Sequence, residues 1–99
     1  MKVTVKFFTT LREIVGKPQE QVELPEVATV DRLLQHLRKK YGKEFTRYVY
    51  NRSGTVQGHL HFLVNGKSIA TLQEFKTKLN ENDIIAILPP VGGGYILKN

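Results

Sequence analysis

Apolar side chains at every second position mark three stretches of the chain as half-buried strands. These stretches are residues 3–7, 21–24 and 60–64, and a period of two is the pattern of a strand with one face in a core. A fourth stretch, residues 84–88, is apolar throughout, which predicts a central strand covered on both faces. Asn65-Gly66 favours a tight turn, because both residues tolerate positive φ, and predicts a short return strand over residues 67–69.

One helix is predicted over residues 30–41. Its apolar residues recur at the spacing of a single helical face, namely Val30, Leu33, Leu34, Leu37 and Tyr41. Thr29 is placed to cap the amino end, and Gly42 is placed to end the helix. This stripe and one face of the sheet would form a single core.

The remaining segments carry weaker patterns. Thr10-Leu11-Arg12-Glu13 fits a capping box that starts a short helical turn ending at Gly16. Lys17 to Glu20 then predicts a hairpin loop, residues 43–58 predict a loop, and residues 72–79 an irregular or short helical crossover.

The order of these elements is strand, strand, helix, strand, short strand, strand. That order predicts an α+β protein in which one main helix packs on one face of a mixed sheet. We place this domain at residues 1–91, followed by a flexible glycine-rich tail at residues 92–99.

Composition removes several classes of function. The chain has 99 residues and no cysteine, so disulfides, thiolate nucleophiles and cysteine metal sites are excluded. No apolar run approaches the roughly 20 residues that span a membrane, and the first residues do not resemble a signal peptide. We therefore expect a cytoplasmic protein without a membrane partner.

A catalytic or metal site is not evident in the sequence. His59 and His61 share one face of a predicted strand, but no third ligand accompanies them, so we interpret them as solvent-facing residues. The carboxylates are scattered over predicted turns and helix starts. We therefore expect neither a bound metal nor a bound cofactor, and no catalytic side chains.

The chain is basic, with a formal net charge of +6. A cluster of cations with interleaved tyrosines comprises Arg38, Lys39, Lys40, Lys43 and Arg47 with Tyr41, Tyr48 and Tyr50. Such a cluster suits nucleic acid. It equally suits a helix whose carboxyl end attracts cations and whose Tyr41 is in the core, and we expect nucleic acid not to be the partner.

The segment after the last predicted strand is unusual. Pro89-Pro90 bars helix and ladder bonding, and the glycines at 92–94 remove every side chain. A thin, extended segment of this kind is typical of a peptide that threads into a narrow site on a partner.

Several motifs in order give the chain a family resemblance. They are Phe7-Phe8, Leu11-Arg12-Glu13, Val64-Asn65-Gly66, Asn82-Asp83 and Pro89-Pro90-Val91-Gly92-Gly93-Gly94. Together they resemble the small subunit of molybdopterin synthase and, more broadly, the β-grasp sulfur carriers and ubiquitin-like proteins. The resemblance implies a β-grasp fold and a carrier that is not itself an enzyme.

The same resemblance implies a chemistry at the glycines. A separate ATP-dependent activating enzyme would adenylate the carboxylate of Gly94, next to Gly93, and sulfur transfer would leave a thiocarboxylate. The large subunit of molybdopterin synthase would accept that sulfur for the pterin cofactor. A ubiquitin-like modifier or a sulfur donor for tRNA thiolation would use the same tail, and a basic nucleic-acid-binding module is a further alternative.

The chain departs from the family pattern after Gly94. Residues 95–99 follow the glycine, and while they remain its carbonyl is an amide that cannot be adenylated. We expect a protease to remove them. A lost carrier role and a different use of the tail are the alternatives.

A docking face follows from the strand alternation. Phe62, Val64, Ile85 and Ile87 are predicted to face the helix, and the opposite face then carries Phe8, His61, Leu63, Ala86 and Leu88. A partner that grips this apolar patch could also receive the adjoining segment, Pro89, Pro90, Val91 and Gly92. The alternative is that Tyr48, Tyr50 or the tail covers the patch within the same chain.

Overall fold

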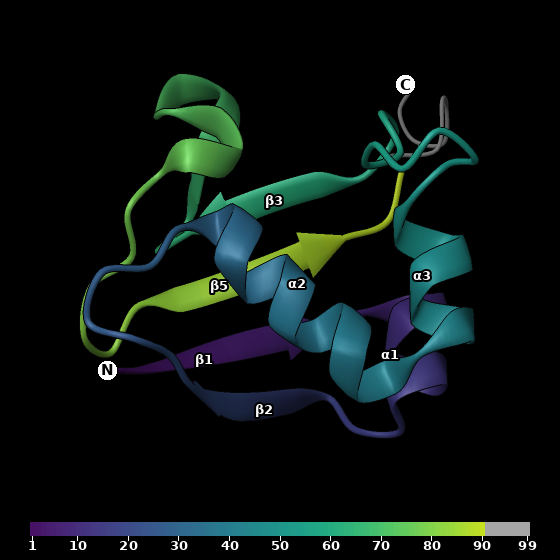
Figure 1. Ribbon diagram of the computed structural model, residues 1–99, viewed down its shortest axis with the longest axis horizontal. Coiled ribbons are helices and arrows are strands. Elements are labelled where there is room, and N and C mark those ends of the chain that lie inside the picture. The colour runs from purple at the N-terminus through teal and green to yellow at the C-terminus, as the bar shows by residue number, and fades with distance from the viewer. Residues whose placement is uncertain (91–99) are drawn as a thin grey trace.

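A mixed five-stranded sheet with helices on one face forms the body of the protein (Figure 1). The structure is a computed structural model and describes residues 1–90. The strands are β1 (Lys2–Phe7), β2 (Gln19–Glu23), β3 (His61–Val64), β4 (Lys67–Ser68) and β5 (Ile84–Leu88). The helices are α1 (Thr9–Val15), α2 (Val30–Tyr41) and α3 (Lys43–Val49), with 3₁₀ turns η1 (Ile69–Thr71) and η2 (Glu74–Lys76).

The strand order is β2-β1-β5-β3-β4, so the last strand lies at the centre. It runs parallel to β1 and antiparallel to β3, and β1 runs antiparallel to β2. This mixed sheet, crossed by α2, confirms the predicted α+β architecture and the β-grasp arrangement (Figure 1).

Helix α2 forms where the periodicity predicts it. The Thr29 hydroxyl accepts the backbone N–H of Arg32 at 3.3 Å, and this cap satisfies a donor that the first turn leaves open. Gly42 ends the helix with φ of 75°, a conformation that favours glycine. The apolar stripe, Val30, Leu33, Leu34 and Leu37, is fully buried.

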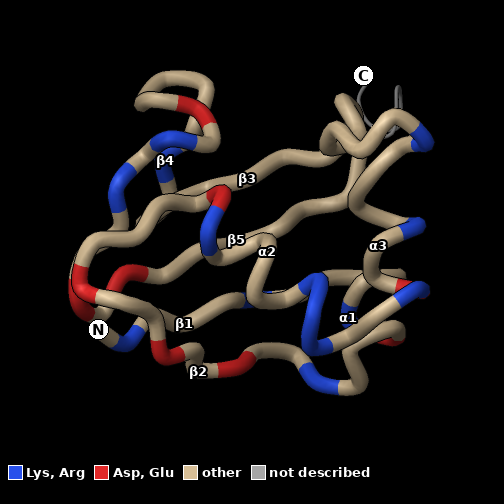
Figure 2. Tube along the Cα trace, in the orientation of Figure 1, with Lys and Arg blue, Asp and Glu red and all other residues tan. Residues whose placement is uncertain are grey.

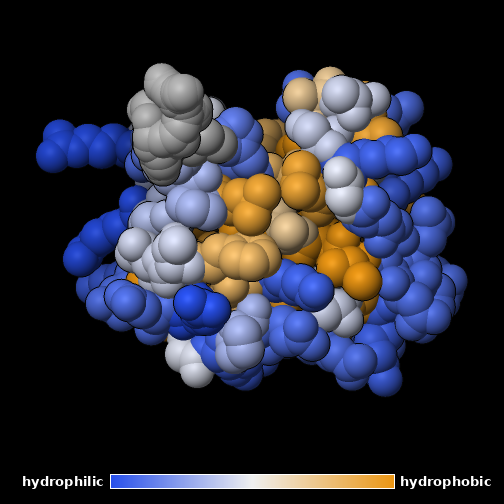
Figure 3. Space-filling model, turned by 180° about the vertical axis from the view of Figure 1, so that it is seen from behind, coloured by the Kyte–Doolittle hydropathy of each residue, from blue (hydrophilic) through white to orange (hydrophobic). Residues whose placement is uncertain are grey.

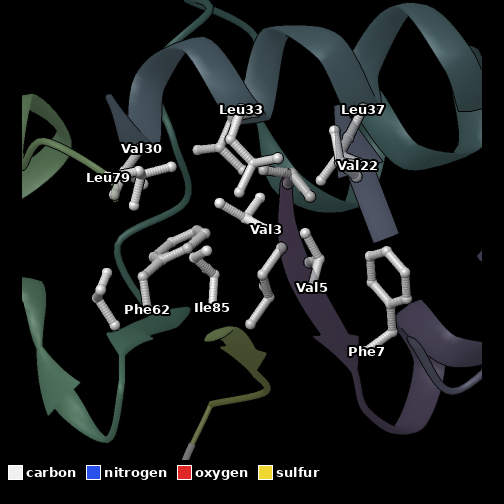
Figure 4. Packing of buried hydrophobic residues seen from close by; sticks show 14 of the residues in the cluster. Val3, Val5, Phe7, Val22, Val30, Leu33, Leu37, Phe62, Leu79 and Ile85 are labelled. Carbon is white, nitrogen blue, oxygen red and sulfur yellow. The ribbon is translucent and has the colours of Figure 1, made fainter. Parts of the chain in front are cut away.

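The core lies between this stripe and one face of the sheet. Figure 4 shows Leu33 and Leu37 projecting from α2 toward Val3, Val5 and Ile85. Burying a side chain of this size contributes about 1.5–3 kcal/mol relative to leaving it exposed. The packing of α2 on the central strands therefore supplies much of the stability of the fold.

Helix α1 begins differently from the prediction. The structure starts it at Thr9, and the capping residue is Phe8, whose side chain makes no capping hydrogen bond. The predicted capping box at residues 10–13 is therefore wrong, because Thr10 already lies inside the first turn. Gly16 ends this helix in the left-handed conformation, as expected.

Two predicted loops are partly wrong. The structure starts β2 at Gln19, so the loop predicted at residues 17–20 is shorter than expected. Residues 43–49 form α3, because Phe45 and Val49, one turn apart, are both buried. The sequence of α3 contains only two core residues and no capping side chain. For this reason residues 43–58 resemble a loop when the sequence is considered alone.

The crossover after β4 confirms the short helical character predicted for residues 72–79, in the form of 3₁₀ turns that begin at Ile69. The return strand consequently ends at Ser68. Among residues 1–90, strand β5 is covered on one face only, and the prediction of cover on both faces is wrong for this part of the chain. Ile84 is 42% exposed, whereas Ile85 and Ile87 are buried.

A buried carboxylate joins β2 to the carboxyl end of α2. Glu20 accepts hydrogen bonds from the Lys40 ammonium and from the Tyr41 hydroxyl, and the Lys17 ammonium lies 3.9 Å away. Burial acts to raise the pKa of Glu20, but these hydrogen bonds and charges outweigh it and lower that pKa below its ordinary value. Burial and the bond to Glu20 raise the pKa of Tyr41.

Candidate functional site

The chain leaves the sheet from its central strand. Pro89 and Pro90, directly after β5, are the last residues that the structure describes. Val91, Gly92, Gly93, Gly94 and residues 95–99, and with them the predicted flexible tail, lie outside the described residues. What the structure shows is the support from which that segment departs.

A network of side chains fixes the start of β5. One carboxylate oxygen of Asp83 accepts the Asn65 side-chain amide at 2.8 Å, and the other accepts the Asn80 backbone N–H at 2.8 Å. The Asn65 side-chain oxygen accepts the Ile84 backbone N–H at 2.9 Å. Asp83 is buried, and its bonds hold the turn after β3 against the entry to β5.

Asn65 therefore has two structural roles. Its φ of 51° makes the tight turn that the sequence predicts with Gly66, and its side chain fastens β5 to that turn. Sequence reasoning identifies the turn but not the bond to Asp83, because no local pattern links residues 18 positions apart. The network fixes the register of β5 and hence which of its side chains face outward.

The sheet face opposite the helices brings the predicted docking residues together. The register places His61 opposite Leu88 and Leu63 opposite Ala86, on β3 and β5. Phe8 extends β1, which runs parallel to β5, so it lies beside Leu88. Leu63, Ala86, Leu88 and Phe8 are all half-buried, and His61 is exposed.

We call this surface the open face and define it by Phe8, His61, Leu63, Ile84, Ala86 and Leu88. Figure 3, seen from behind, shows apolar side chains gathered at the centre of this side and bordered by hydrophilic ones. The inward residues predicted with it, Phe62, Val64, Ile85 and Ile87, are buried beneath the helices. The alternation thus assigns the two faces correctly.

Sequence reasoning missed one member of the open face, Ile84, and one charged neighbour of it, Lys6. Ile84 lies two positions before Ala86 and is 42% exposed, so the alternation that selects Ala86 also selects Ile84. Lys6 pairs with Ala86 across β1 and β5 and places a cation beside the apolar patch. A combination of apolar centre and charged neighbour is usual in surfaces that bind another protein.

The tyrosines proposed as an internal cover do not lie on the open face. Tyr50 is buried, and the Arg38 guanidinium lies 4.7 Å from its ring centroid. Because Arg38 belongs to α2, this contact places Tyr50 on the helical side of the sheet. Tyr48 packs against the same core from α3.

Metal-ligating groups are sparse in the described part of the chain. Residues 1–90 contain no group of three or more His, Cys, Asp or Glu side chains that could hold a metal ion. His59 and His61 are both exposed. Within the same residues, no helix is long and apolar enough to cross a membrane.

Known proteins resemble this chain over almost its whole length. Small archaeal modifier protein 3 of Haloferax volcanii is 32% identical over 94 residues, which are 95% of this chain and 100% of that protein. The molybdopterin synthase sulfur carrier subunit of Drosophila melanogaster is 31% identical, covering 95% of this chain and 92% of that protein.

Solved structures agree with the sequence comparisons. The crystal structure of SAMP1 from Haloferax volcanii matches with a TM-score of 0.82 and 26% identity, covering 95% of this chain and 100% of that one. The sequence profile of the ThiS family matches residues 5–94, from within β1 to the last of the three glycines. The chain therefore belongs to the ThiS family, and its fold is the ubiquitin-like β-grasp.

Proposed function

We propose that this protein is a sulfur carrier that donates sulfur for molybdopterin synthesis as a thiocarboxylate on Gly94. One observation carries the proposal: β5, the central strand, leads directly into Pro89-Pro90-Val91-Gly92-Gly93-Gly94, and the family match ends at Gly94. A relative with 31% identity is a molybdopterin synthase sulfur carrier subunit.

The reactive atom in this proposal belongs to the backbone. The Gly94 carboxylate attacks the α-phosphate of ATP on a separate activating enzyme, which forms an acyl-adenylate and releases pyrophosphate. Hydrosulfide, HS⁻, from a separate sulfur donor then attacks the acyl carbon and displaces AMP, which leaves the thiocarboxylate. The carrier binds no cofactor of its own, has no catalytic side chains, and acts in the cytoplasm where ATP is present.

The open face is the proposed docking surface for both partners. Leu88 lies on that face and the chain continues from it through Pro89 and Pro90. A partner that covers Leu88, Leu63 and Ile84 therefore receives the glycines next to its own contact surface. The large subunit of molybdopterin synthase and the activating enzyme would use this face in turn.

Processing is a necessary part of the proposal. Residues 95–99 follow Gly94, and while they are attached Gly94 has no carboxylate to adenylate. We propose that a protease removes them. The intact mass of the protein isolated from its own cells tests this step, and a chain that accepts sulfur with residues 95–99 still attached contradicts it.

The central experiment compares two forms of the chain with the activating enzyme and ATP. A chain that ends at Gly94 is expected to release pyrophosphate and to gain the mass of an adenylate, whereas the chain of residues 1–99 is expected to do neither. Deletion of Gly94 from the shorter form is the matched control. Equal adenylation of the deleted and undeleted forms contradicts the assignment of Gly94.

A modifier function is the second candidate. It is favoured by the 32% identity to small archaeal modifier protein 3, and it would join the same glycine to target proteins or pass its sulfur to tRNA. Capture of partners from the native cells separates the two. A pterin-synthase large subunit supports the first function, and isopeptide links to lysines of many proteins support the second.

A further inference from the structure

Positive charge is concentrated on the helical side of the molecule. Residues 30–52 hold seven of the fifteen Lys and Arg residues but two of the nine Asp and Glu residues. Five of the six net positive charges thus belong to α2, α3 and the loop that follows. Figure 2 shows the blue positions along the carboxyl half of α2 and along α3, and red positions gathered near the amino terminus.

Most of these cations have no carboxylate partner in residues 1–90. Lys40 is bonded to Glu20. Ion pairs within 4.0 Å among the described residues do not include the other six, namely Arg32, Arg38, Lys39, Lys43, Arg47 and Arg52. We call these six residues the basic face; all are exposed.

Three separate hollows with shared lining residues lie along the basic face. Arg38, Lys39, Lys43 and Arg47 line a groove of about 560 Å³ between the end of α2 and α3. Lys39 also lines a neighbouring hollow with Arg32. Arg47 likewise lines another hollow, together with Arg52. The six cations therefore follow one path across the surface.

Helix electrostatics explain only part of this arrangement. Arg38 and Lys39 lie in the last turn of α2, where the partial negative charge of the helix end favours cations. Arg32 lies in the first turn of the same helix and Lys43 in the first turn of α3, where that effect disfavours them. The charge of the basic face is thus greater than the helices need.

Against the expectation from the sequence that nucleic acid is not a partner, we propose that the basic face binds the phosphate backbone of a single nucleic-acid strand. Cations that line neighbouring hollows, without a carboxylate within 4.0 Å among residues 1–90, match a chain of phosphates. An acidic protein fits less well, because protein interfaces have an apolar or aromatic centre. Here the apolar residues of α2 and α3 are in the core.

The mode of binding follows from the tyrosines. Tyr41 donates its hydroxyl to Glu20, Tyr50 is buried, and Tyr48 packs against the core, so these three rings are engaged within the fold and do not form a stacking platform for bases. The interleaved tyrosines therefore do not indicate base stacking, although the cations of the same pattern are exposed and can contact phosphates. The strand would be held through phosphates alone, without sequence preference and with equal use of RNA and DNA.

The position of the basic face allows simultaneous binding of a protein partner. Helix α2 covers one side of the sheet and the open face is the other (Figures 1 and 3). A bound strand would therefore leave the open face uncovered. This inference does not depend on the proposed sulfur chemistry.

The test measures binding of the full chain to a fluorescent oligouridylate by anisotropy over a range of salt concentrations. Six phosphate contacts predict a slope of log affinity against log salt of about −4, from about 0.7 per contact on a single strand. The triple variant Lys39→Gln/Lys43→Gln/Arg47→Gln is expected to reduce that slope to about −2 and to weaken binding at least about tenfold at low salt.

A matched variant separates local from total charge. Lys2→Gln/Lys67→Gln/Lys76→Gln removes the same charge outside the basic face, from β1, β4 and η2, and is expected to keep the slope. Thermal melting confirms that both variants are folded. Equal weakening by the two triples, or no binding of the unaltered chain at low salt, overturns the proposal.

Two further probes decide the ligand. Oligothymidylate is expected to bind as oligouridylate does, since both present the same phosphodiester charge, and a strong preference for either overturns backbone-only binding. Polyglutamate at equal charge concentration is expected to compete poorly. If it displaces the oligonucleotide as well as unlabelled oligouridylate does, the basic face fits an acidic protein and the proposal is wrong.

Discussion

The two faces of the sheet differ in how far their side chains are exposed to solvent. Under the helices, Ile85 and Ile87 are almost fully buried, at 0% and 1% exposure. On the open face, Ile84 of the same strand is 42% exposed and Leu88 is half-buried (Figure 3). Because α2 covers one face only, the apolar residues of the other face are left uncovered by residues 1–90 and form the proposed docking surface.

Because of this difference, some residues of β5 stabilise the fold and others form the proposed docking surface. Alternate residues of β5 belong to the core and to the open face, so a register shift by one residue would exchange them. The bonds from Asn65 to Asp83 and Ile84 oppose such a shift. The same network thereby fixes the position of Leu88 and Pro89, where the chain leaves the sheet, relative to the apolar patch.

Neighbouring substitutions in β5 would test this division most strongly. Ile87→Ala removes buried methyl groups and is expected to lower the free energy of unfolding by about 3 kcal/mol. Leu88→Ala, one position on, is expected to lower it by less than about 1 kcal/mol, because its side chain already meets solvent. Urea unfolding of both variants measures the difference, and equal losses would mean that the two faces are not distinct.

A charge on the open face would separate folding from docking. Leu88→Asp is expected to weaken binding of the large subunit by about 2 kcal/mol if Leu88 is a hot spot, because a carboxylate is desolvated on binding. Its melting temperature should remain near that of the unaltered chain. The control is Leu72→Asp, since Leu72 is exposed in the crossover after η1, and equal weakening by both variants would contradict a localised docking face.

The carboxylate beneath α2 predicts a pH dependence. The pKa of Glu20 is lowered in the folded protein, so its contribution is present above the unfolded pKa of about 4.3 and is lost as pH falls through the folded value. Glu20→Gln is expected to cost about 1 kcal/mol at neutral pH, since Lys40 and Tyr41 then lose a charged acceptor. Below the folded pKa this difference from the unaltered chain should shrink.

Unfolding by urea at neutral and at acid pH measures the effect. Glu26→Gln is the matched control, because Glu26 is exposed and forms no ion pair within 4.0 Å among residues 1–90. A loss of stability at acid pH that is the same with and without Glu20 would exclude this carboxylate as its source.

The periodicity of apolar residues and the presence of turn-forming residues predicted the elements whose order defines the fold. The stripe from Val30 to Tyr41, the alternation in β1 and β3, and the Asn65-Gly66 turn each contain their signal within a few residues. The same alternation found the open face, apart from Ile84. Such predictions succeed because a helix or strand repeats its pattern locally.

The contacts that fix the site could not be found this way. The bonds of Asp83 to Asn65 and of Glu20 to Lys40 join residues far apart in the chain. Helix α3 depends on Phe45 and Val49 reaching a core formed by other segments. Which face of β5 is buried likewise depends on where α2 lies. An apolar run in the sequence does not indicate whether one face of the strand is buried or both.

The smallest expected effect concerns the charges of the helical side. Arg32 lies in the first turn of α2, where the helix end disfavours a cation, and Arg38 lies in the last turn with its guanidinium 4.7 Å from the Tyr50 ring centroid. Arg38→Gln is therefore expected to lower stability by about 0.5–1 kcal/mol. Arg32→Gln should leave it unchanged or raise it by up to about 0.5 kcal/mol.

Thermal melts at low and high salt would measure both changes, and the difference between them should diminish as salt screens the helix ends. If Arg32→Gln loses as much stability as Arg38→Gln, Arg32 stabilises the fold. Its position is then explained without a bound ligand. If it loses none, Arg32 contributes to the basic face without contributing to the helix beneath it. A cation of this kind, beside a hollow that Lys39 also lines, is what the proposed phosphate binding predicts for Arg32.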